Sequence, residues 1–376
     1  MSPIVEFGYR DDQRARGVPR PPTKHGSSPR LLEMLMEFSD LLALVEQGRD
    51  LTCTQMESAI DACMRGAVAD ERIGQFLLAL RAKGEAVDEI AGAALAMRRH
   101  MTPIRSQRTG LLDTCGTGGD ASGTFNVSTA AAIVTAAAGV PVAKHGNRSI
   151  TSKSGSADVL SALGVRIDAP VATVEQCLEE LGICFCFAPL MHPAMKHVAA
   201  VRRILGVPTI FNLLGPLCNP AQAPYQLLGV GRRSLHDKMA AALQRLAPRR
   251  AVVISGDDGL DEVTVAASTR AIVVTPDSQS EFTWRPSDFG VAQVDSLASA
   301  RVDGPDASAA LIRRVLAGER GVPRDLVVVN AAAAVWTSGA HTDPQAAAAA
   351  AAHSIDSGAA LRLLDQWVAL SQRGAS

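Results

Sequence analysis

Apolar residues recur three or four positions apart over the first third of the chain, a spacing typical of amphipathic helices. The clearest stretches are Leu41–Val45 and Ile73–Leu80. The pattern is broken by glycines, which favour helix ends: Gly48, Gly66 and Gly84. We therefore expect a small all-helical domain over residues 31–103.

After Pro103 the pattern changes to short continuous apolar runs, which are typical of buried strands. The runs interpreted as strands are Leu111–Cys115, Val140–Ala143, Ile183–Phe187, Ala251–Ser255, Ala271–Val274 and Leu326–Val329. The helical stretches that alternate with them are Ala130–Ala138, Val171–Leu181 and Ala309–Leu316. Alternation of this kind predicts a large α/β catalytic domain over residues 104–376, with a central, mostly parallel sheet.

Two segments have unusual composition. The alanines from Ala346 to Ala352 form a low-complexity run, but Asp343 and Pro344 ahead of them match a helix N-cap and a first-turn proline. We predict a packed helix there. Residues 1–30 show no sustained period and are expected to form a flexible N-terminal extension.

Bulk composition narrows the class of function. The balance of 37 Lys and Arg against 38 Asp and Glu lacks the basic excess that non-specific nucleic-acid binding requires. We expect no nucleic-acid partner. The seven cysteines lack the spacing of a zinc site, so we expect reduced thiols. No apolar stretch is long enough to span a bilayer, so we expect a cytoplasmic protein with no membrane partner.

A glycine-rich turn, Gly116-Thr117-Gly118-Gly119-Asp120, follows the first strand candidate. Asn126-Val127-Ser128-Thr129 comes next, where a helix is expected to begin. Glycines let backbone N–H groups approach a ligand closely, and the start of a helix with nearby hydroxyls binds anions. The alternative is an ordinary strand-to-helix turn with a Ser or Thr cap.

The same glycines loosely fit a dinucleotide-binding fingerprint, which also requires an acidic residue about twenty positions further on. No Asp or Glu occurs from Ala121 through Ala157, so we reject that interpretation. The acid-free stretch instead holds ten Ser and Thr residues and the side chains of Lys144, His145, Arg148 and Lys153. This stretch thus has no carboxylate that would repel a phosphate, and it offers hydroxyl and cationic hydrogen-bond donors. A polar surface loop is the alternative interpretation.

Carboxylates gather after the strand candidate Ala251–Ser255: Asp257, Asp258, Asp261 and Glu262. Hard oxygen ligands of this kind suit Mg²⁺, which typically bridges to substrate phosphates. Read alone, an acidic loop is usually a solvated turn. A fourth cluster, residues 187–197, leads to Arg202 and Arg203, either of which would suit the carboxylate of a flat aromatic acid. A capping histidine and a helix-surface arginine explain this cluster equally well.

Taken together, the motifs and their order resemble the anthranilate phosphoribosyltransferase family. The resemblance runs from about Met36 to the C-terminus. It rests on Gly-Thr-Gly-Gly-Asp at 116–120, Lys-His-Gly-Asn-Arg at 144–148 and Asp-Gly-Leu-Asp-Glu at 258–262. Further support comes from Phe211–Pro220 and Asn330–Ala334.

The resemblance implies a nucleoside-phosphorylase-like fold, with helices from about 195–222 packing onto the small helical domain, and a homodimer joined through the helical parts. It implies that phosphoribosyl pyrophosphate (PRPP) donates its 5-phosphoribosyl group to the amine of anthranilate. The products would be N-(5-phosphoribosyl)anthranilate and pyrophosphate, a step of tryptophan biosynthesis. A separate anthranilate synthase is expected to act upstream.

The resemblance also implies which residues bind each ligand. PRPP would contact Gly116, Gly119, Asp120, Thr124, Asn126, Val127, Ser128, Thr129, Lys144, His145, Gly146, Asn147, Arg148, Ser149, Ile150, Thr151, Ser152 and Ser156. Anthranilate would contact Gly116, Asn147, Pro189, His192 and Arg202, and Mg²⁺ would be held by Ser128, Asp261 and Glu262. No single catalytic residue is assigned, because catalysis is expected to be electrostatic, through the metal and the phosphate loops.

Two other functions remain open. A pyrimidine nucleoside phosphorylase shares the general architecture but acts on phosphate and a nucleoside. A non-catalytic, nucleic-acid-binding relative of the same fold would have a broad basic groove. The near-neutral charge and the intact acidic pair count against the second alternative.

Overall fold

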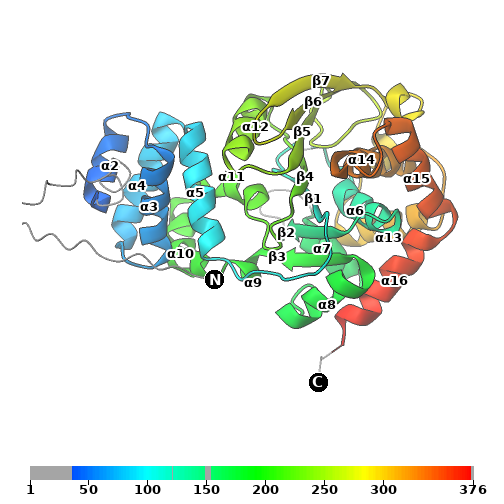
Figure 1. Cartoon of the computed structure of the whole chain (residues 1–376), viewed down its shortest axis with the longest axis horizontal. Helices are drawn as coiled ribbons and strands as arrows, with labels where there is room; N and C mark the ends of the chain where they lie inside the picture. The colour runs from blue at the N-terminus through cyan, green and yellow to red at the C-terminus, as the bar shows by residue number, and fades with distance from the viewer. Residues whose placement is uncertain (1–35, 121, 149–153, 374–376) are drawn as a thin grey trace, which may run out of the picture.

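The computed structural model describes residues 36–120, 122–148 and 154–373. The predicted extension, residues 1–30, lies outside the described residues. Figure 1 shows two lobes side by side, a helical lobe on the left, mainly blue and cyan, and a larger lobe on the right in which helices surround a sheet. The expected fold class, a small helical domain beside a large α/β domain, is confirmed.

The helical lobe combines consecutive N-terminal helices with two that return from later in the chain. They are α2 (Phe38–Glu46), α3 (Cys53–Met64), α4 (Asp70–Lys83), α5 (Val87–Arg99), α10 (Lys196–Leu205) and α11 (Phe211–Leu214). A capping box starts α3, since Thr52 Oγ1 accepts from the N–H of Gln55 at 3.3 Å and the Gln55 side chain accepts from the N–H of Thr52 at 2.9 Å. The helices share one apolar core, and α10 packs against α3 and α4.

Within the described residues, the larger lobe is built on one sheet of seven strands. They are β1 (Leu112–Gly116), β2 (Val142–Gly146), β3 (Ile183–Phe187), β4 (Tyr225–Gly229), β5 (Arg250–Gly256), β6 (Thr269–Val274) and β7 (Gln279–Trp284). Their order is β3-β2-β1-β4-β5-β6-β7. The first five are parallel, and β6 and β7 are antiparallel to their neighbours. The sheet is therefore mostly parallel, as predicted.

Helices cover both faces of this sheet. They are α6 (Val127–Ala137), α7 (Ser156–Leu163), α8 (Val171–Leu181), α9 (Ala188–Met191), α12 (His236–Arg245), α13 (Pro305–Leu316), α14 (Val322–Ser338), α15 (Pro344–Asp356) and α16 (Ala359–Ser371). Short 3-10 turns are η1 (Pro193–Met195), η2 (Gly215–Leu217), η3 (Arg233–Leu235), η4 (Pro286–Phe289) and η5 (Ala298–Ala300).

Alternate residues of β5 show how the two faces are used. Val252 and Ile254 belong to the core that includes α6 and α14, whereas Ala251 and Val253 belong to the core shared with α12 and the helical lobe. This is the two-residue period of a strand that is buried on both faces. The helical lobe therefore joins the sheet on the face opposite α6.

One predicted strand is wrong. Leu326–Val329 lies inside α14, which begins after Gly321 and ends before the left-handed Gly339 (φ 80°). A helix buried on nearly all sides is apolar on nearly all sides, so a four-residue run within it cannot be told from a strand by its pattern. The predicted alanine-rich helix is confirmed as α15, because the Asp343 side chain accepts from the N–H of Ala346 at 2.9 Å.

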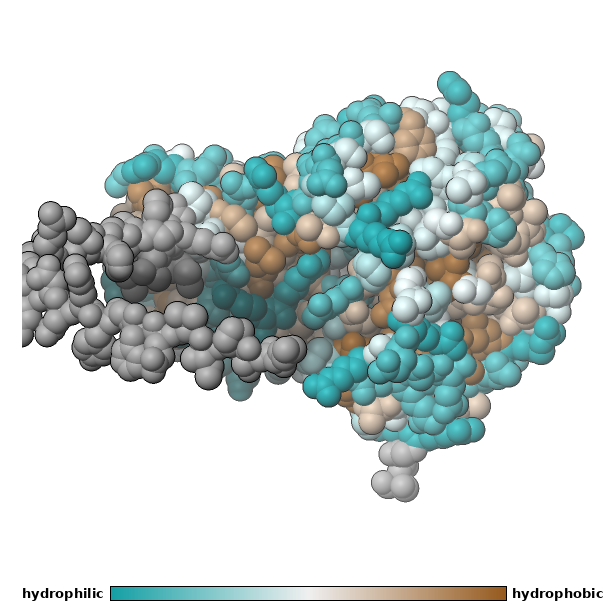
Figure 2. Space-filling view, in the orientation of Figure 1, coloured by the Kyte–Doolittle hydropathy of each residue, from teal (hydrophilic) through white to brown (hydrophobic). Residues whose placement is uncertain are grey.

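Most of the apolar side chains of the described residues are buried, and the large ones that are exposed include Leu78, Leu190 and Ile204. Among the described residues, none of the helices combines the length and apolar character needed to cross a membrane. On the face shown in Figure 2, hydrophilic residues cover much of the larger lobe and the hydrophobic ones form scattered patches. All seven cysteines are free thiols, as expected.

Candidate active site

The order of the strands places the candidate site. The chain leaves β1, adds β2 and β3 on one side, and then returns to add β4 on the other side of β1. In open α/β sheets, ligands bind in the crevice at the carboxyl ends of the strands where the order reverses. Here these ends are Gly116 of β1 and Gly229 of β4, which are paired in the parallel register.

The glycine-rich turn after β1 is fixed to the acidic loop. The N–H of Thr117 donates to the carbonyl of Gly229 at 2.9 Å, and the N–H of Gly118 donates to Oδ2 of Asp261 at 3.1 Å. A Cβ atom at Gly116 would lie 2.6 Å from the same carboxylate oxygen, so a larger residue would force the Asp261 side chain to move. Glycine at this position therefore lets the Asp261 carboxylate approach the backbone of the turn.

The remaining residues of this turn lie close by. Gly119 has a left-handed φ of 82°, and a Cβ placed there would meet nothing within 4 Å. Asp120 packs beside Gly231, whose Cβ would lie 2.9 Å from the Asp120 nitrogen. Thr124 shares a 2.9 Å hydrogen bond with the hydroxyl of Ser122. The backbone of Gly119 is thus open to a ligand, whereas Thr124 is partly engaged within the loop.

The start of α6 is capped by Asn126 rather than by a Ser or Thr. Its Oδ1 accepts from the N–H of Thr129 at 3.1 Å, and the Thr129 hydroxyl donates to the same oxygen. Val127 and Thr129 are buried, with exposures of 1% and 0%. The side chain of Val127 therefore packs in the core, and its N–H donates to the carbonyl of Phe125 at 2.7 Å. Ser128 is directed to the sheet end, next to Lys144.

Lys144 is a buried cation at the end of β2, with an exposure of 2%. Its Nζ donates to the carbonyl of Thr114 at 2.5 Å and to Oγ of Ser128 at 3.3 Å. Burial lowers the pKa of Lys144, and the nearby Asp113 carboxylate opposes that shift. A bound anion would stabilise the charged form in the same way.

The side chain of His145, the next residue, projects from the opposite face of β2. Its Nδ1 lies 2.9 Å from the Gly215 carbonyl, and its Nε2 lies 3.2 Å from Nε2 of His192. A carbonyl only accepts, so the neutral His145 ring carries its proton on Nδ1. Burial lowers the pKa of His145 to about 3 and that of His192 to about 4, so both rings are neutral near pH 7.

The loop after β2 closes on the start of α7. A Cβ at Gly146 would overlap Oγ of Ser156, so only glycine fits there. The Asn147 carbonyl accepts from the N–H of Ala157 at 3.2 Å and from the Ser156 hydroxyl at 3.5 Å. Arg148 is exposed and pairs with Asp158 at 2.9 Å. Ser149, Ile150, Thr151 and Ser152 lie outside the described residues.

The four carboxylates after β5 divide into two pairs. Asp257 is exposed and pairs with Arg233 at 3.2 Å, and Asp258 accepts from the Thr264 hydroxyl at 2.6 Å, so both serve the local turn. Asp261 and Glu262 point to the strand ends instead. Glu262 and Ser128 line one small hollow together with Thr114, Gly229 and Asn330.

Asp261 and Glu262 are buried close to each other and to Asp120, so their negative charges are poorly compensated. Burial, and then the neighbouring Asp120, raise the pKa of Asp261 to about 7. Burial, and then Asp261, raise the pKa of Glu262 well above its usual value, while Lys144 acts in the opposite direction. Carboxylates held together in this way favour a bound cation.

The donor set fits a hydrated Mg²⁺ ion better than a fully protein-bound metal. In the part of the chain that the structure describes, no three His, Cys, Asp or Glu side chains gather to hold a metal. Two carboxylates and the Ser128 hydroxyl leave the remaining octahedral positions to water and substrate oxygens, which is how Mg²⁺ is commonly bound. The residues present therefore fit this ion.

The residues expected to meet an aromatic acid lie on the opposite side of the β2 end. Pro189 is exposed in α9, while His192 is only 6% exposed and packs on His145. Arg202 turns inward from α10, with its Cζ atom 5.4 Å from the centre of the Phe211 ring, whereas the neighbouring Arg203 is exposed. Of the two arginines, Arg202 is thus the one that packs inside the lobe.

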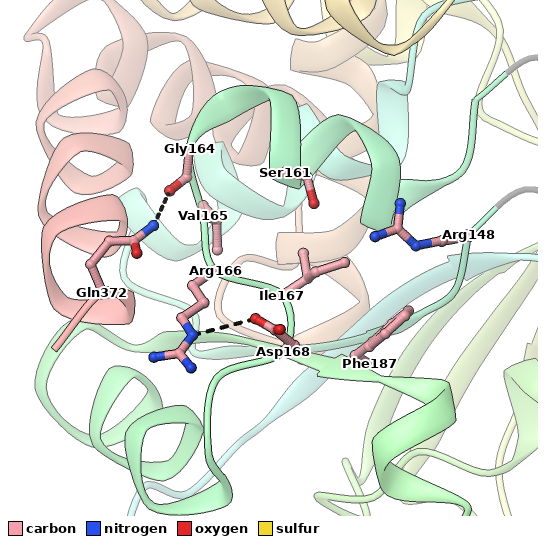
Figure 3. Close-up of a pocket in the computed structure, with 9 residues that line it drawn as sticks. All are labelled: Arg148, Ser161, Gly164, Val165, Arg166, Ile167, Asp168, Phe187 and Gln372. Atoms are coloured by element: carbon pink, nitrogen blue, oxygen red, sulfur yellow. Dashed lines mark hydrogen bonds and ion pairs between the residues drawn. The ribbon is translucent and has the colours of Figure 1, made fainter. Parts of the chain in front are cut away.

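A larger hollow beside α7 does not suit a phosphate. Figure 3 shows Arg148 and Arg166 at its two ends, with Ile167, Asp168 and Phe187 between them. Arg166 pairs with Asp168 at 3.3 Å, and Arg148 pairs with Asp158 outside the hollow. Each guanidinium is thus already engaged by a carboxylate.

The sequence did not predict the structural roles of two residues that support the acidic loop. The Asn330 side chain accepts from the N–H of Val263 and donates to the carbonyl of the same residue, both at 2.8 Å, and this fixes the acidic loop to α14. Gly229 lets that loop cross β4, because a Cβ there would overlap the Asp261 carbonyl oxygen. A glycine directly after Leu227-Leu228 was the available signal for Gly229. Asn330 was noted within the segment Asn330–Ala334 of the family resemblance, but no local signal shows its contact with Val263.

This fold and site define a transferase of a known family. The helical bundle domain of the glycosyl transferase family matches residues 39–101, and the a/b domain of that family matches residues 108–361. The chain belongs to this glycosyl transferase family.

Within the family, the similarity is to anthranilate phosphoribosyltransferases. The enzyme of that name from Rhodopirellula baltica is 50% identical over 331 residues, which is 88% of this chain and 96% of the relative. The enzyme from Moorella thermoacetica is 47% identical over 328 residues, 87% of this chain and 96% of the relative.

Solved structures of the same name have the same fold. The structure from Thermus thermophilus has a TM-score of 0.83 at 41% identity, and the comparison covers 89% of this chain and 99% of that one. The structure from Saccharomyces cerevisiae in complex with PRPP and Mg has a TM-score of 0.80 at 29% identity, covering 89% and 99%.

Proposed function

We propose that this protein is an anthranilate phosphoribosyltransferase, which transfers the 5-phosphoribosyl group of PRPP to the amine of anthranilate in tryptophan biosynthesis. One observation carries the proposal: the glycine-rich turn, the start of α6 and the Asp261–Glu262 pair meet at the point where the strand order reverses. Donors for phosphates and ligands for a divalent cation are thus adjacent. Relatives bearing this enzyme name cover most of the chain.

PRPP would occupy the crevice at the carboxyl ends of the strands around β1, where the strand order reverses. The open backbone of Gly119 would face this crevice, with the Ser128 hydroxyl at the start of α6 beside it and the Lys144 cation beneath it. These are the groups that bind phosphates without a strong base. The other residues in the proposed PRPP set are those predicted from the sequence, and the assignments made to Ser149 through Ser152 stay predictions.

Mg²⁺ would be held by Ser128, Asp261 and Glu262. When bound, it would neutralise the charge that develops on the departing pyrophosphate. Support comes from the raised pKa of both carboxylates, described above, and from the yeast relative solved with PRPP and Mg.

In the proposed reaction, the amine of anthranilate attacks C1 of the ribose while pyrophosphate leaves from the opposite side. The turn at Gly118-Gly119 and the Lys144 ammonium would hold the phosphates in line. Donors placed before the reaction stabilise developing charge, and each is commonly worth about 2–4 kcal/mol in the transition state. Arg202 would pair with the anthranilate carboxylate, with Asn147, His192, Pro189 and the backbone of Gly116 around the ring.

Several further expectations belong to this proposal. We place the domain boundary near residue 103, after α5, and assign residues 195–222 to the helical lobe. We propose a homodimer joined through that lobe, because it exposes Ile204 of α10 (82%) and Leu78 of α4 (45%), and α10 packs on α4. We expect a cytoplasmic enzyme that receives anthranilate from a separate synthase, with no nucleic-acid or membrane partner.

The experiment that tests the function is an assay of the purified protein with PRPP, Mg²⁺ and anthranilate, followed by the loss of anthranilate fluorescence. The proposal expects turnover that depends on all three. Phosphorolysis of a pyrimidine nucleoside without turnover of anthranilate would favour the phosphorylase instead. A shift of nucleic acid on a gel at moderate salt, without either activity, would favour the binding protein.

A further inference from the structure

The turn η2 joins the two lobes through three consecutive carbonyls. The first accepts from Nδ1 of His145 in β2 at 2.9 Å, the second from the Gln226 side chain in β4 at 2.5 Å, and the third from Nε of Arg98 in α5 at 2.7 Å. Two of these donors belong to the sheet and the third to the helical lobe. A single turn is thus held from both lobes by side chains alone.

Arg98 is an unusual anchor. It is half-buried, and no carboxylate among the described residues forms an ion pair with it. Burial lowers the pKa of the guanidinium, the direction expected for a cation removed from water. A charged group in such a place costs stability unless it makes a specific contact, and the contact that it makes is with the Leu217 carbonyl.

The segment that Arg98 holds carries the proposed aromatic-acid half of the site. α11 runs directly into η2, and its Phe211 ring lies under the guanidinium of Arg202. At the other end of the same segment, the Gly215 carbonyl sets the position and tautomer of His145, which in turn contacts His192. Residues 211–217 therefore support Arg202 and, through His145, His192, which are both proposed to surround anthranilate. They do not support the carboxylates proposed for Mg²⁺.

We infer that Arg98 is a positioning residue for the aromatic substrate, acting from the helical lobe through η2 on His145 and Arg202. The inference rests on the proposed function. Arg98 itself touches neither substrate. Its effect is to fix residues 211–217, so its loss would misplace Arg202 and, through the His145 ring, His192. The glycine-rich turn, Ser128 and Lys144 are held by contacts that do not involve η2, so PRPP binding should be largely kept.

The test compares Arg98→Met with Arg98→Lys, and uses Arg99→Met as the matched control. Arg99 is the next residue of the same helix, but its side chain is 51% exposed and pairs with Glu57 at 3.2 Å. Steady-state kinetics would give KM for anthranilate and for PRPP separately, and calorimetry would give the Kd of PRPP with Mg²⁺. Retention of PRPP affinity also shows that a variant is folded.

The expected result is a rise of about tenfold in KM for anthranilate in Arg98→Met, with KM and Kd for PRPP within about twofold of wild type. Arg98→Lys keeps a charged donor and should recover part of the loss, and Arg99→Met should behave as wild type. If Arg98→Met does not fold, the same split in Arg98→Lys supports the inference.

An unchanged KM for anthranilate, or an equal change for both substrates, in whichever of the two variants folds would overturn the inference. The same holds if Arg99→Met reproduces the effect. Absence of turnover in the wild-type protein is a different result, because it removes the proposed function rather than the role of Arg98.

Discussion

Lys144 and His145 are neighbours in β2, yet their side chains enter different environments on the two faces of the sheet. Lys144 lies on the face of α6, where its Nζ donates to Ser128 and the carboxylates of Asp113, Glu262 and Asp261 are near enough to favour its charge. His145 lies on the face of η2, where it meets a carbonyl and a second neutral ring. Because successive side chains of a strand point to opposite faces of the sheet, the groups around Lys144 are separated from those around His145.

The difference shows how one sheet end can serve two unlike substrates. Phosphates are bound by charge and by backbone donors, so the α6 face concentrates charged groups and tolerates their desolvation. A flat aromatic acid would be bound mainly by shape and by one cation, which the neutral rings of the η2 face and Arg202 would provide under the proposed assignment. The two faces should therefore respond differently to mutation, and the predictions below test that difference.

The largest effect is expected when the charged face loses its acidic pair. The double change Asp261→Ala and Glu262→Ala removes both proposed magnesium ligands and should reduce kcat by about 10³-fold, because charge on the leaving group is no longer neutralised. The fold should remain, since removing two desolvated carboxylates relieves repulsion. Turnover and circular dichroism measure the two outcomes.

The control for the double variant is Asp257→Ala, which removes an exposed carboxylate of the same loop that pairs only with Arg233 among the described residues. It should keep normal turnover. Near-normal turnover in the double variant would defeat the assignment of the metal ligands.

A smaller loss is expected when the same face loses its cation. Lys144→Met keeps most of the buried apolar stem and removes the ammonium that donates to Thr114 and Ser128. We expect the Kd of PRPP to rise about 10²-fold, since a desolvated cation is lost beneath the phosphates, while anthranilate binding changes little. Calorimetry with each ligand checks this, and a comparable loss of affinity for both ligands would contradict it.

Much of the site could be predicted from the sequence because its motifs are local and lie next to strand ends. The turn at Gly116 and the loop at Lys144 each lie within a few residues of a strand end, so their motif and their place in the fold coincide. Val171–Leu181 and Ile183–Phe187 have the predicted bounds because a polar, amphipathic helix stops at Gly182 and an apolar strand begins directly after it.

What escaped prediction depends on contacts between distant residues. β7 is exposed along most of its length, so Gln279–Trp284 has no apolar pattern to read. Asn330 supports the acidic loop from 67 positions away, and no local motif marks that pairing. The motif alone also did not separate Asp257 and Asp258 from Asp261 and Glu262, since only the folded loop shows which carboxylates face the strand ends.

On the opposite face, Arg202→Ala should raise KM for anthranilate about tenfold or more and change KM for PRPP far less. The guanidinium is oriented by the Phe211 ring and is the cation proposed to meet the substrate carboxylate. Arg203→Ala, the exposed neighbour, is the control. Equal effects of Arg202→Ala on both substrates would argue against the aromatic-acid role.

The smallest expected effect is on the pH dependence of stability, and it tests whether His192 on the η2 face is held neutral in the folded protein. Burial lowers the pKa of His192 from 6.5 to about 4, so the folded protein binds fewer protons at this residue than the unfolded chain. Its contribution to stability is therefore full above pH 6.5 and is lost as the pH falls toward 4. Between pH 7.5 and pH 6 the loss amounts to about 1 kcal/mol. His192→Gln should reduce the fall in Tm over this interval, whereas His341→Gln, on the surface loop before α15, should not. An identical fall in Tm in wild type and His192→Gln would show that the ring is not held neutral in the folded protein.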